Sequence, residues 1–193
     1  MTPPGGPPSP PDPVVKLALE TAARSPCLSK RGVVAYITGA VDAGVLVIAG
    51  AGYNSPPAPF TCPGRARCAG NCGKRCVHAE MRALRAATAG LRDELELVHV
   101  GLAADGGVVA CDGPSCWQCA REVLDVGFVA GVWLYLRLHR CMACRRFEDS
   151  TEADDRCSRC PECGSALTVT GVWRRYTAEE FYRVTLERCG MAP

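Results

Sequence analysis

Hydrophobic positions in this chain follow two periods, which predict an alternation of helices and strands. Apolar residues spaced three and four apart over residues 14–24 indicate an amphipathic helix. Two short apolar runs, 33–37 and 45–49, are separated by polar sequence around Asp42 and Gly44. That pattern is typical of a β-hairpin.

The middle of the chain predicts further alternation after a long loop. Residues 50–76 have little periodicity and much Gly, Pro and Cys, so a loop is expected there. Beyond it, the pattern predicts helices over 77–89 and 115–126 and strands over 95–102 and 132–138. Strands alternating with helices at this spacing predict an α/β sandwich with parallel pairing in its second half.

The two ends differ from this middle. Residues 1–13 are dense in Pro and Gly, so we expect an extended, solvated tail. Cysteine pairs and an acidic stretch follow Leu138, which predicts a boundary between a domain over 14–137 and a module over 138–193. A closing helix is expected over 177–189, with Thr177 and Glu180 forming a capping box.

Composition narrows the class of protein. Apolar residues make up 48%, enough for a core, and the net charge of +2 neither requires nor excludes a nucleic-acid partner. The amino-terminal residues lack the basic start and apolar stretch of a signal sequence, and no apolar run is long enough to span a membrane. We therefore expect a cytoplasmic protein, in which the 14 cysteines bind metal rather than form disulfides.

The informative chemistry lies in two short motifs, His78-Ala79-Glu80 and Cys116-Trp117-Gln118-Cys119. A His-x-Glu followed by Cys-x-x-Cys is the signature of zinc nucleobase deaminases. One imidazole and two thiolates leave a fourth zinc position for water, whose pKa falls from 15.7 towards about 7. Glu80 is expected to move the protons of the reaction, so His78, Cys116 and Cys119 are predicted zinc ligands and Glu80 the catalytic residue.

Helix ends are expected to support this arrangement. Ser115 and Gln118 fit a capping box, which would place Cys116 and Cys119 on one face of the first helical turn. The helix dipole there favours thiolates. Taken singly, each motif has an ordinary structural explanation, such as a solvated glutamate or half of a structural zinc site. Their combination favours the catalytic interpretation.

Four segments of the chain carry a family resemblance: ARSPC, AGYNSPP, CVHAEMRAL and CWQCAREVLDVGFVAGVWLY. With them, residues 17–135 resemble the deoxycytidylate (dCMP) deaminase branch of the cytidine deaminase superfamily. The resemblance implies a three-layer α/β fold with a five-stranded mixed sheet and hydrolytic deamination at C4 of a cytosine nucleotide. It also implies homo-oligomers.

Within this resemblance, Asn54 is expected to contact the sugar, and Ala79 is the other candidate for substrate binding. The chain departs from the family pattern at Ser115, an extra residue before the first zinc cysteine, and at Arg82, where the family commonly has Asn. The base-stacking and phosphate-binding residues are therefore not transferred. Three cations are candidates for phosphate contact or for solvated charge: Lys74, Arg75 and Arg82.

Further cysteines predict one or two structural zinc sites. Some dCMP deaminases carry a structural zinc whose ligands, matched by position, imply Cys27, Cys62 and Cys76, with Cys68 or Cys72 as the fourth. A Gly- and Pro-rich loop buries little apolar surface, so a metal would help to order it. The alternative is a set of free buried thiols.

A second group has the spacing of a zinc ribbon, with four candidate ligands: Cys141, Cys144, Cys160 and Cys163. Gly164 suits the turn after the last of them, and Cys157 is an alternative ligand. Four thiolates leave no open position, so the expected role is structural. Cys111 and Cys189 are interpreted as ordinary cysteines. A secondary interpretation is a nucleic-acid or subunit contact through four arginines: Arg145, Arg146, Arg174 and Arg175.

The leading functional hypothesis is conversion of dCMP to dUMP and ammonia. Alternatives are a deaminase acting on another cytosine nucleoside or nucleotide, one acting on single-stranded DNA or RNA, and a catalytically silent zinc scaffold. Aromatic residues at 6% and little net charge disfavour the nucleic-acid substrate. A silent scaffold would have no need of Glu80.

Overall fold

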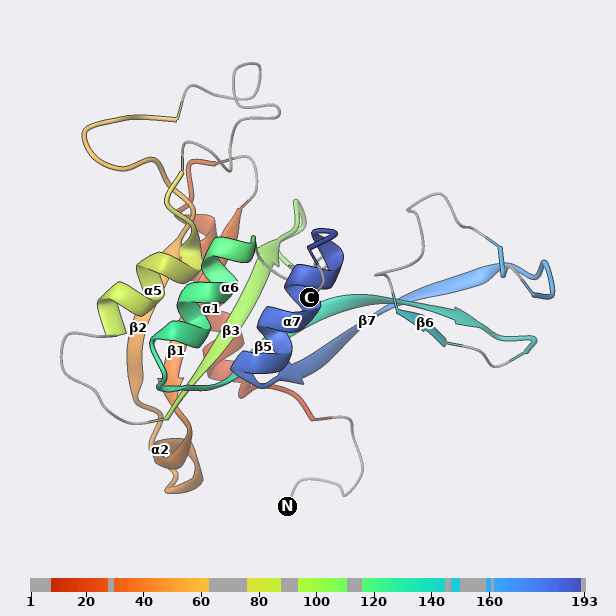
Figure 1. Cartoon of the computed structure of the whole chain (residues 1–193), viewed down its shortest axis with the longest axis horizontal. Coiled ribbons are helices and arrows are strands. Elements are labelled where there is room, and N and C mark those ends of the chain that lie inside the picture. The colour runs from red at the N-terminus through yellow and green to blue at the C-terminus, as the bar shows by residue number, and fades with distance from the viewer. Residues whose placement is uncertain are drawn as a thin grey trace.

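The fold is built on one mixed β-sheet. The computed structural model describes residues 8–27, 30–62, 76–87, 94–110, 116–144, 147–149, 159–160 and 162–191. Within these residues the sheet has seven strands: β1 Arg31–Ile37, β2 Ile48–Tyr53, β3 Leu95–Leu102, β4 Val108–Val109, β5 Val129–Cys141, β6 Phe147–Asp149 and β7 Leu167–Tyr176. Their order is β2-β1-β3-β5-β6, with β4 beside β3 and β7 beside β5 (Figure 1).

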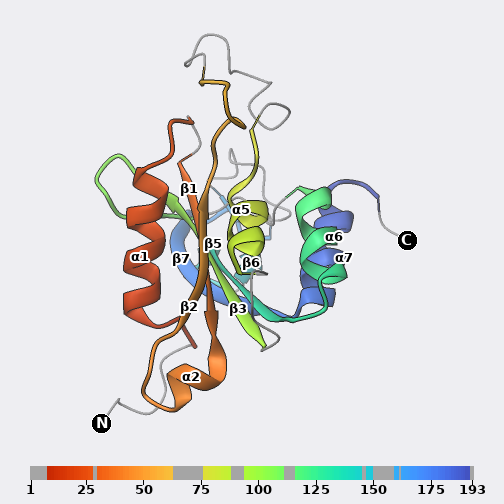
Figure 2. The same ribbon diagram turned by 90° about the vertical axis from the view of Figure 1, so that its left-hand side faces the viewer.

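Helices cover both faces of the sheet. The covering helices are α1 Asp12–Ala23, α5 Ala79–Ala87, α6 Trp117–Asp125 and α7 Ala178–Arg188, whereas the short α2, Thr38–Asp42, lies in the connection between β1 and β2. Figure 2 shows α1 on one face and α5, α6 and α7 on the other. The predicted α/β fold with a mixed central sheet between helical layers is confirmed. The implied count of five strands is wrong, because the short β4 and β6 and the long β7 join β1, β2, β3 and β5 to make seven.

Strand directions follow from the connections. β1 pairs antiparallel with β2, as the predicted hairpin requires, and it also pairs antiparallel with β3. β3 and β5 are parallel, because α6 carries the chain back between them. The predicted parallel pairing holds for this pair, whereas β5 and β7 are antiparallel.

The hairpin and the helix after it differ from prediction at their boundaries. The second strand begins at Ile48 instead of 45, since Val45 and Leu46 are exposed and α2 occupies the connection. Gly44, with φ of +78°, ends that turn in the left-handed region. The helix predicted over 77–89 begins at Ala79, because the Val77 backbone pairs with Ser55. Its predicted end lies outside the described residues.

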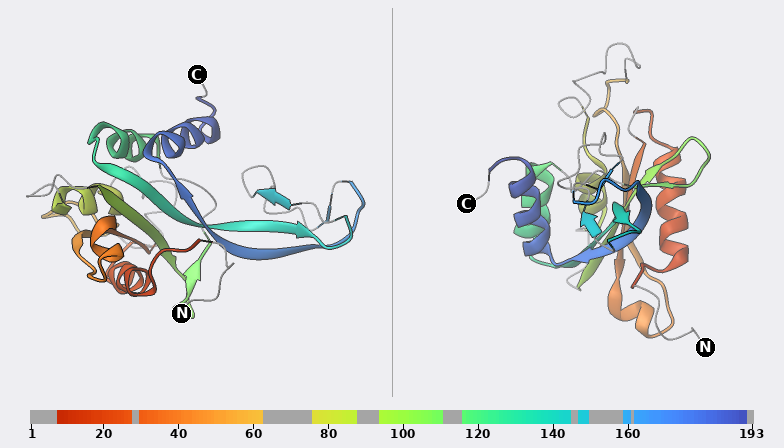
Figure 3. Two further views of the ribbon diagram at one scale, coloured as in Figure 1. Left: turned by 90° about the horizontal axis from the view of Figure 1, so that it is seen from below. Right: turned by 90° about the vertical axis from the view of Figure 1, so that its right-hand side faces the viewer.

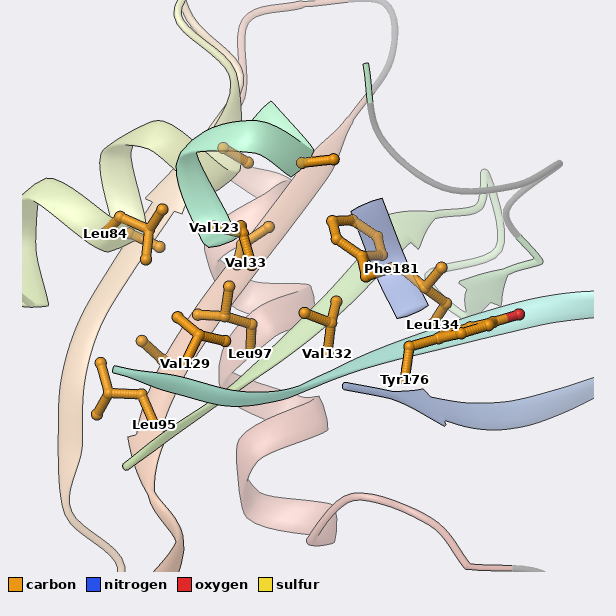
Figure 4. Close-up of a cluster of buried hydrophobic side chains, with 14 of the residues drawn as sticks. Val33, Leu84, Leu95, Leu97, Val123, Val129, Val132, Leu134, Tyr176 and Phe181 are labelled. Carbon is orange, nitrogen blue, oxygen red and sulfur yellow. The ribbon is translucent and has the colours of Figure 1, made fainter. Parts of the chain in front are cut away.

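Two apolar clusters hold the layers together. One lies between the sheet and α5, α6 and α7, and the other between the sheet and α1. Figure 4 shows Leu97 and Val132 on the strands facing Phe181 of α7. Phe181 makes α7 part of this cluster, and burying a side chain of its size contributes about 1.5–3 kcal/mol to stability.

A long hairpin extends away from the helices. β5 and β7 pair continuously from Val132–Tyr176 to Cys141–Leu167, and Figures 1 and 3 show them projecting beyond the rest of the sheet. We call this hairpin the arm. The predicted division at Leu138 falls inside β5, so it marks no break in secondary structure, and the division into domains stays a prediction.

The helices at the two ends agree with their sequence patterns. α7 begins with the predicted capping box, in which Glu180 N–H donates to Thr177 Oγ1 at 3.1 Å and Thr177 N–H to Glu180 Oε2 at 2.8 Å. α1 begins at Asp12, two residues before the predicted start, since Pro13 is tolerated in the first turn. No helix in the described part of the chain has the length and apolarity that crossing a bilayer requires.

Candidate metal centre and active site

The beginning of α5 lies directly against β2. A Cβ atom on Gly52 would overlap the carbonyl oxygen of Ala79, and one on Gly50 would overlap that of Ala83. Glycine at these positions therefore lets the helix approach the strand closely. The buried Asn54, just after β2, accepts a hydrogen bond at 2.9 Å from the Ala79 N–H. This bond satisfies a backbone donor at the helix start and fixes Asn54 beside the HAE motif.

The beginning of α6 supplies the two cysteines. Cys116 is the N-cap residue, with φ −67° and ψ 153°, and its side chain makes no capping hydrogen bond. Helical backbone starts at Trp117, one residue later than the capping pattern implies; Ser115 lies outside the described residues, so the Ser115–Gln118 capping box stays a prediction. Cys119 follows in the first turn and is buried.

These two helix beginnings meet. Cys116 Sγ lies 3.2 Å from His78 Nδ1, Cys119 Sγ lies 3.3 Å from the same nitrogen, and the two sulfur atoms are 3.3 Å apart. All three atoms lie within 4.8 Å of one another. Tetrahedral zinc needs such atoms about 3.5–3.8 Å apart. The donor set and spacing fit a zinc ion with small adjustments, and His78 would bind through Nδ1.

The thiols of Cys116 and Cys119 shift each other's pKa strongly. The hydrogen bond between the two sulfur atoms lowers the pKa of Cys116 to about 4, helped by His78, and the same bond raises the pKa of Cys119. One proton is thus shared between two sulfurs. A cation in its place would hold both as thiolates, which is how metal binding releases protons from cysteine sites.

Glu80 is buried on the first turn of α5, with 5% of its surface exposed. Its Oε1 lies 3.7 Å from His99 Nδ1 on β3. His99 packs edge-on against Phe181 of α7, with ring centroids 5.8 Å apart. Burial lowers the pKa of His99, although Glu80 opposes this shift, so the imidazole is neutral at pH 7.

Sequence reasoning missed His99. The signal was available, since two polar residues, Glu96 and His99, interrupt the apolar run 95–102. Residues two apart on a strand share a face, so His99 follows Leu95 and Leu97, which belong to the cluster beneath α5 and α6. The helices that cover this face of the sheet carry the catalytic candidates.

The structure brings together part of the second predicted zinc site. Cys27 Sγ and Cys76 Sγ lie 3.1 Å apart, at the end of α1 and before α5. Cys62 is half-buried, and its place in the site stays a prediction. Cys68 and Cys72 lie outside the described residues.

Among the predicted phosphate candidates, Arg82 is described, whereas Lys74 and Arg75 lie outside the described residues. Arg82 Nη2 donates to the carbonyl oxygen of Pro56 at 3.2 Å, which ties α5 to the loop after β2. Arg82 and Arg85 line a hollow of about 400 Å³ whose lining does not include the HAE or Cys-x-x-Cys ligands. A phosphate contact by Arg82 stays a prediction.

The four cysteines of the predicted ribbon meet at the end of the arm. Cys141 Sγ lies 3.4 Å from Cys163 Sγ, and Cys144 Sγ lies 3.6 Å from Cys160 Sγ. All four sulfur atoms lie within 4.8 Å of one another. Cys111 and Cys157 lie outside the described residues, and Cys189 is exposed at the end of α7.

Two of the four arginines predicted for a partner contact interact with residues of this chain. Arg175 donates through Nε to Glu96 Oε1 at 2.9 Å, and Arg174 lies over the Tyr176 ring at 5.0 Å. The ion pair gives Arg175 a role within the fold, since its charge neutralises the buried Glu96, and a partner contact through these arginines stays a prediction. Arg145 and Arg146 lie outside the described residues.

Comparison with known proteins finds matches among solved structures and none by sequence. No family model matches the chain, and no curated protein matches it. A dCMP deaminase from the cyanophage S-TIM5, solved in apo form, is similar with a TM-score of 0.44 and 20% identity. The match covers 63% of this chain and 78% of that one. Function is therefore inferred from the side chains of the site.

Proposed function

We propose that this protein is a zinc-dependent deaminase that hydrolyses the C4 amino group of a cytosine nucleotide, with dCMP as its substrate and dUMP and ammonia as products. One observation carries the proposal. The His78 nitrogen and the Cys116 and Cys119 sulfurs form a single cluster, and the buried carboxylate of Glu80 stands two residues after His78, on the first turn of α5.

Each ligand has a defined role. His78, Cys116 and Cys119 would hold the zinc and leave its fourth position open to the reaction. When bound, zinc supplies an acidified water for attack on the ring and stabilises developing negative charge. Two thiolates and one neutral imidazole give the site three ligands that also suit zinc over harder ions such as magnesium.

Glu80 moves the protons. It accepts a proton from the attacking water and gives it to the ring nitrogen next to C4. It then takes the proton of the new C4 hydroxyl and passes it to the departing amino group, so that ammonia leaves and C4 becomes a carbonyl. The C–O bond forms at C4 before the C–N bond breaks, and one water is consumed for each ammonia released. Burial of Glu80 keeps bulk water away from these transfers.

His99 is a positioning residue in this proposal. Its neutral ring fills the space between Glu80 and Phe181, so it limits the rotamers open to the carboxylate without adding a charge. Asn54 would orient the sugar, with its amide fixed by the Ala79 N–H. A substrate contact by Ala79, homo-oligomers and a cytoplasmic location stay predictions.

A substrate panel tests the proposal. Purified, zinc-loaded protein is incubated with dCMP, CMP, deoxycytidine, cytidine and cytosine, and ammonia release is measured beside the loss of cytosine absorbance. We expect turnover of dCMP above the others. Turnover of cytidine but not dCMP would contradict the nucleotide substrate while leaving the deaminase chemistry in place, and no turnover of any cytosine compound would contradict both.

A further inference from the structure

The end of the arm carries a cluster of four cysteines that deamination does not use. Cys141 is the last residue of β5, and Cys144 follows in the turn after it. Cys160 and Cys163 lie just before β7. Two ligands therefore come from each side of the hairpin, and both Cys-x-x-Cys pairs point their sulfur atoms at one place.

Backbone geometry around the second pair supports this convergence. The Gly164 N–H donates to the Cys160 carbonyl at 2.9 Å, and the Cys160 N–H donates to the Ser165 carbonyl at 2.8 Å. Gly164 has φ of +68°, a conformation that glycine adopts without strain. The Arg159 side chain donates to the Gly164 carbonyl at 3.1 Å, which further fixes the turn.

The sulfur geometry matches a closed zinc site. Tetrahedral zinc with Zn–S bonds of about 2.3 Å places its sulfur ligands about 3.8 Å apart. The observed separations of 3.4 and 3.6 Å lie close to this value. Four thiolates occupy every position, so a metal held there has no open site for catalysis.

The surroundings show why a metal would matter. Cys141 and Cys160 are buried, whereas Cys144 and Cys163 are exposed, and the neighbouring Met142 is 64% exposed. The described residues at this end bury little apolar surface apart from the cysteines. A hairpin end with so small a core gains most of its order from a cross-link or a metal.

We propose that Cys141, Cys144, Cys160 and Cys163 bind a structural Zn²⁺ that closes the end of the arm and is independent of the catalytic zinc. The base of the arm is held without it. The β5–β7 ladder runs back to Val132–Tyr176, and the Arg175–Glu96 ion pair ties that end to β3. Loss of this zinc therefore disorders the end of the arm and leaves the helices in place.

The test measures metal content, which does not depend on the reaction. Zinc per chain is determined for the wild type, Cys144→Ser/Cys163→Ser, Cys116→Ser and the matched control Cys189→Ser, all purified under reducing conditions. We expect the arm variant and Cys116→Ser each to lose one zinc, the two losses to be additive, and the control to lose none. Unchanged zinc in the arm variant would overturn the proposal.

A second measurement on the wild type guards against misfolding of the arm variant. Chelated protein is reloaded with Co²⁺, whose visible absorption strengthens with the number of thiolate ligands. We expect a four-thiolate spectrum superimposed on that of a two-thiolate site. A two-thiolate spectrum alone, or cysteines found as two disulfides in the reduced preparation, would overturn the arm site. If only the arm zinc is present, the proposed function fails and this inference stands.

Discussion

At the residue scale, one carboxylate distinguishes the site from an ordinary metal centre. The imidazole of His78 and the two thiols would bind zinc whatever lay beside them. Glu80 adds a buried group that can carry a proton between water, ring and leaving group. Its surroundings, His99 above all, keep it in the low-dielectric interior where its position is fixed.

The buried His99 predicts a dependence of stability on pH. Burial lowers its pKa below the ordinary 6.5, with Arg31 acting in the same direction and Glu80 against it. Below about pH 6.5 the unfolded state therefore binds more protons at this residue than the folded state does. The contribution of His99 to stability is complete above that pH and is lost as the pH falls towards the folded pKa.

The pH dependence of stability is checked by urea unfolding of the wild type and His99→Gln at pH 7.5 and 5.5. Chelator is present throughout, so that zinc release does not contribute. The wild type should lose more stability on acidification than the variant. An equal or larger loss in His99→Gln would show that the histidine is not buried in its neutral form.

Spacing made the ligands and Glu80 predictable, because zinc chemistry needs these residue types at short separations along two helix starts. The sequence marks His99 as a polar residue within an apolar run, but nothing in it links this residue to Glu80. Their proximity arises only when β3 lies beneath α5. The role of Arg175 was missed for the same reason, since its partner Glu96 lies 79 residues away.

At the element scale, close contact between β2 and α5 positions the HAE motif. Gly52 allows this contact, and Gly32 allows the equivalent approach of α1 on the opposite face. Gly52→Ala should destabilise the fold by about 1–3 kcal/mol through overpacking, and should lower kcat because α5 moves with His78 and Glu80.

Gly32→Ala is the matched control, and thermal unfolding with steady-state kinetics compares the two. Gly32→Ala should lower the free energy of unfolding by a similar amount and leave kcat within about twofold, since α1 carries no site residue. Gly39→Ala, where a Cβ meets nothing within 4 Å, should change neither quantity. Equal effects of Gly52→Ala and Gly32→Ala on kcat would contradict this role for β2.

The capping box of α7 gives a second element-scale prediction. Thr177→Ala removes the hydrogen bond to the Glu180 N–H and should cost about 0.5–2 kcal/mol. For a chain of this length, about 1 kcal/mol lowers Tm by roughly 2–4 °C. Calorimetry measures the change, with Thr177→Ser expected to retain the cap. A Thr177→Ala variant as stable as the wild type would show that the box contributes nothing.

The start of a helix is less predictable from sequence than its type. Thr177 and Glu180 form a capping box as predicted, whereas α6 has Cys116, in extended conformation, as its N-cap, one residue later than its capping pattern implies. Helix type and approximate position were thus predictable from periodicity. The exact helix start was not, because long-range pairing decides it, as with Val77 and Ser55.

At the scale of the whole molecule, the Arg175–Glu96 ion pair joins the arm to the body. Glu96 is 2% exposed on β3, and Gly131 of β5 leaves room for the pair. Arg175→Met leaves a buried carboxylate without its cation. We expect a loss of about 2–3 kcal/mol, below the range for a fully buried pair because the arginine is partly exposed.

Chemical denaturation of Arg175→Met, Glu96→Gln and the double variant measures the coupling. The double variant should be more stable than the sum of the two single losses predicts. Strict additivity would mean that the pair does not interact.

The arm also explains which part of the architecture could not be predicted. Alternation of apolar runs gave the α/β class, and the parallel β3–β5 pair follows from it. The resemblance ended near Tyr135, however, so the antiparallel β7 and the seven-stranded sheet lay beyond it. Cysteine spacing indicated the cluster at the end of the arm, but not that two long strands would carry it.

The most direct test of the account compares the wild type with Glu80→Gln at equal zinc content. Both proteins are loaded to the same zinc per chain, and ammonia release from dCMP is followed at pH 7. Glutamine keeps the shape of the side chain but cannot shuttle protons, so we expect zinc to be retained and the rate to fall by at least about 10²-fold. A Glu80→Gln protein that deaminates dCMP at the wild-type rate would contradict the central claim.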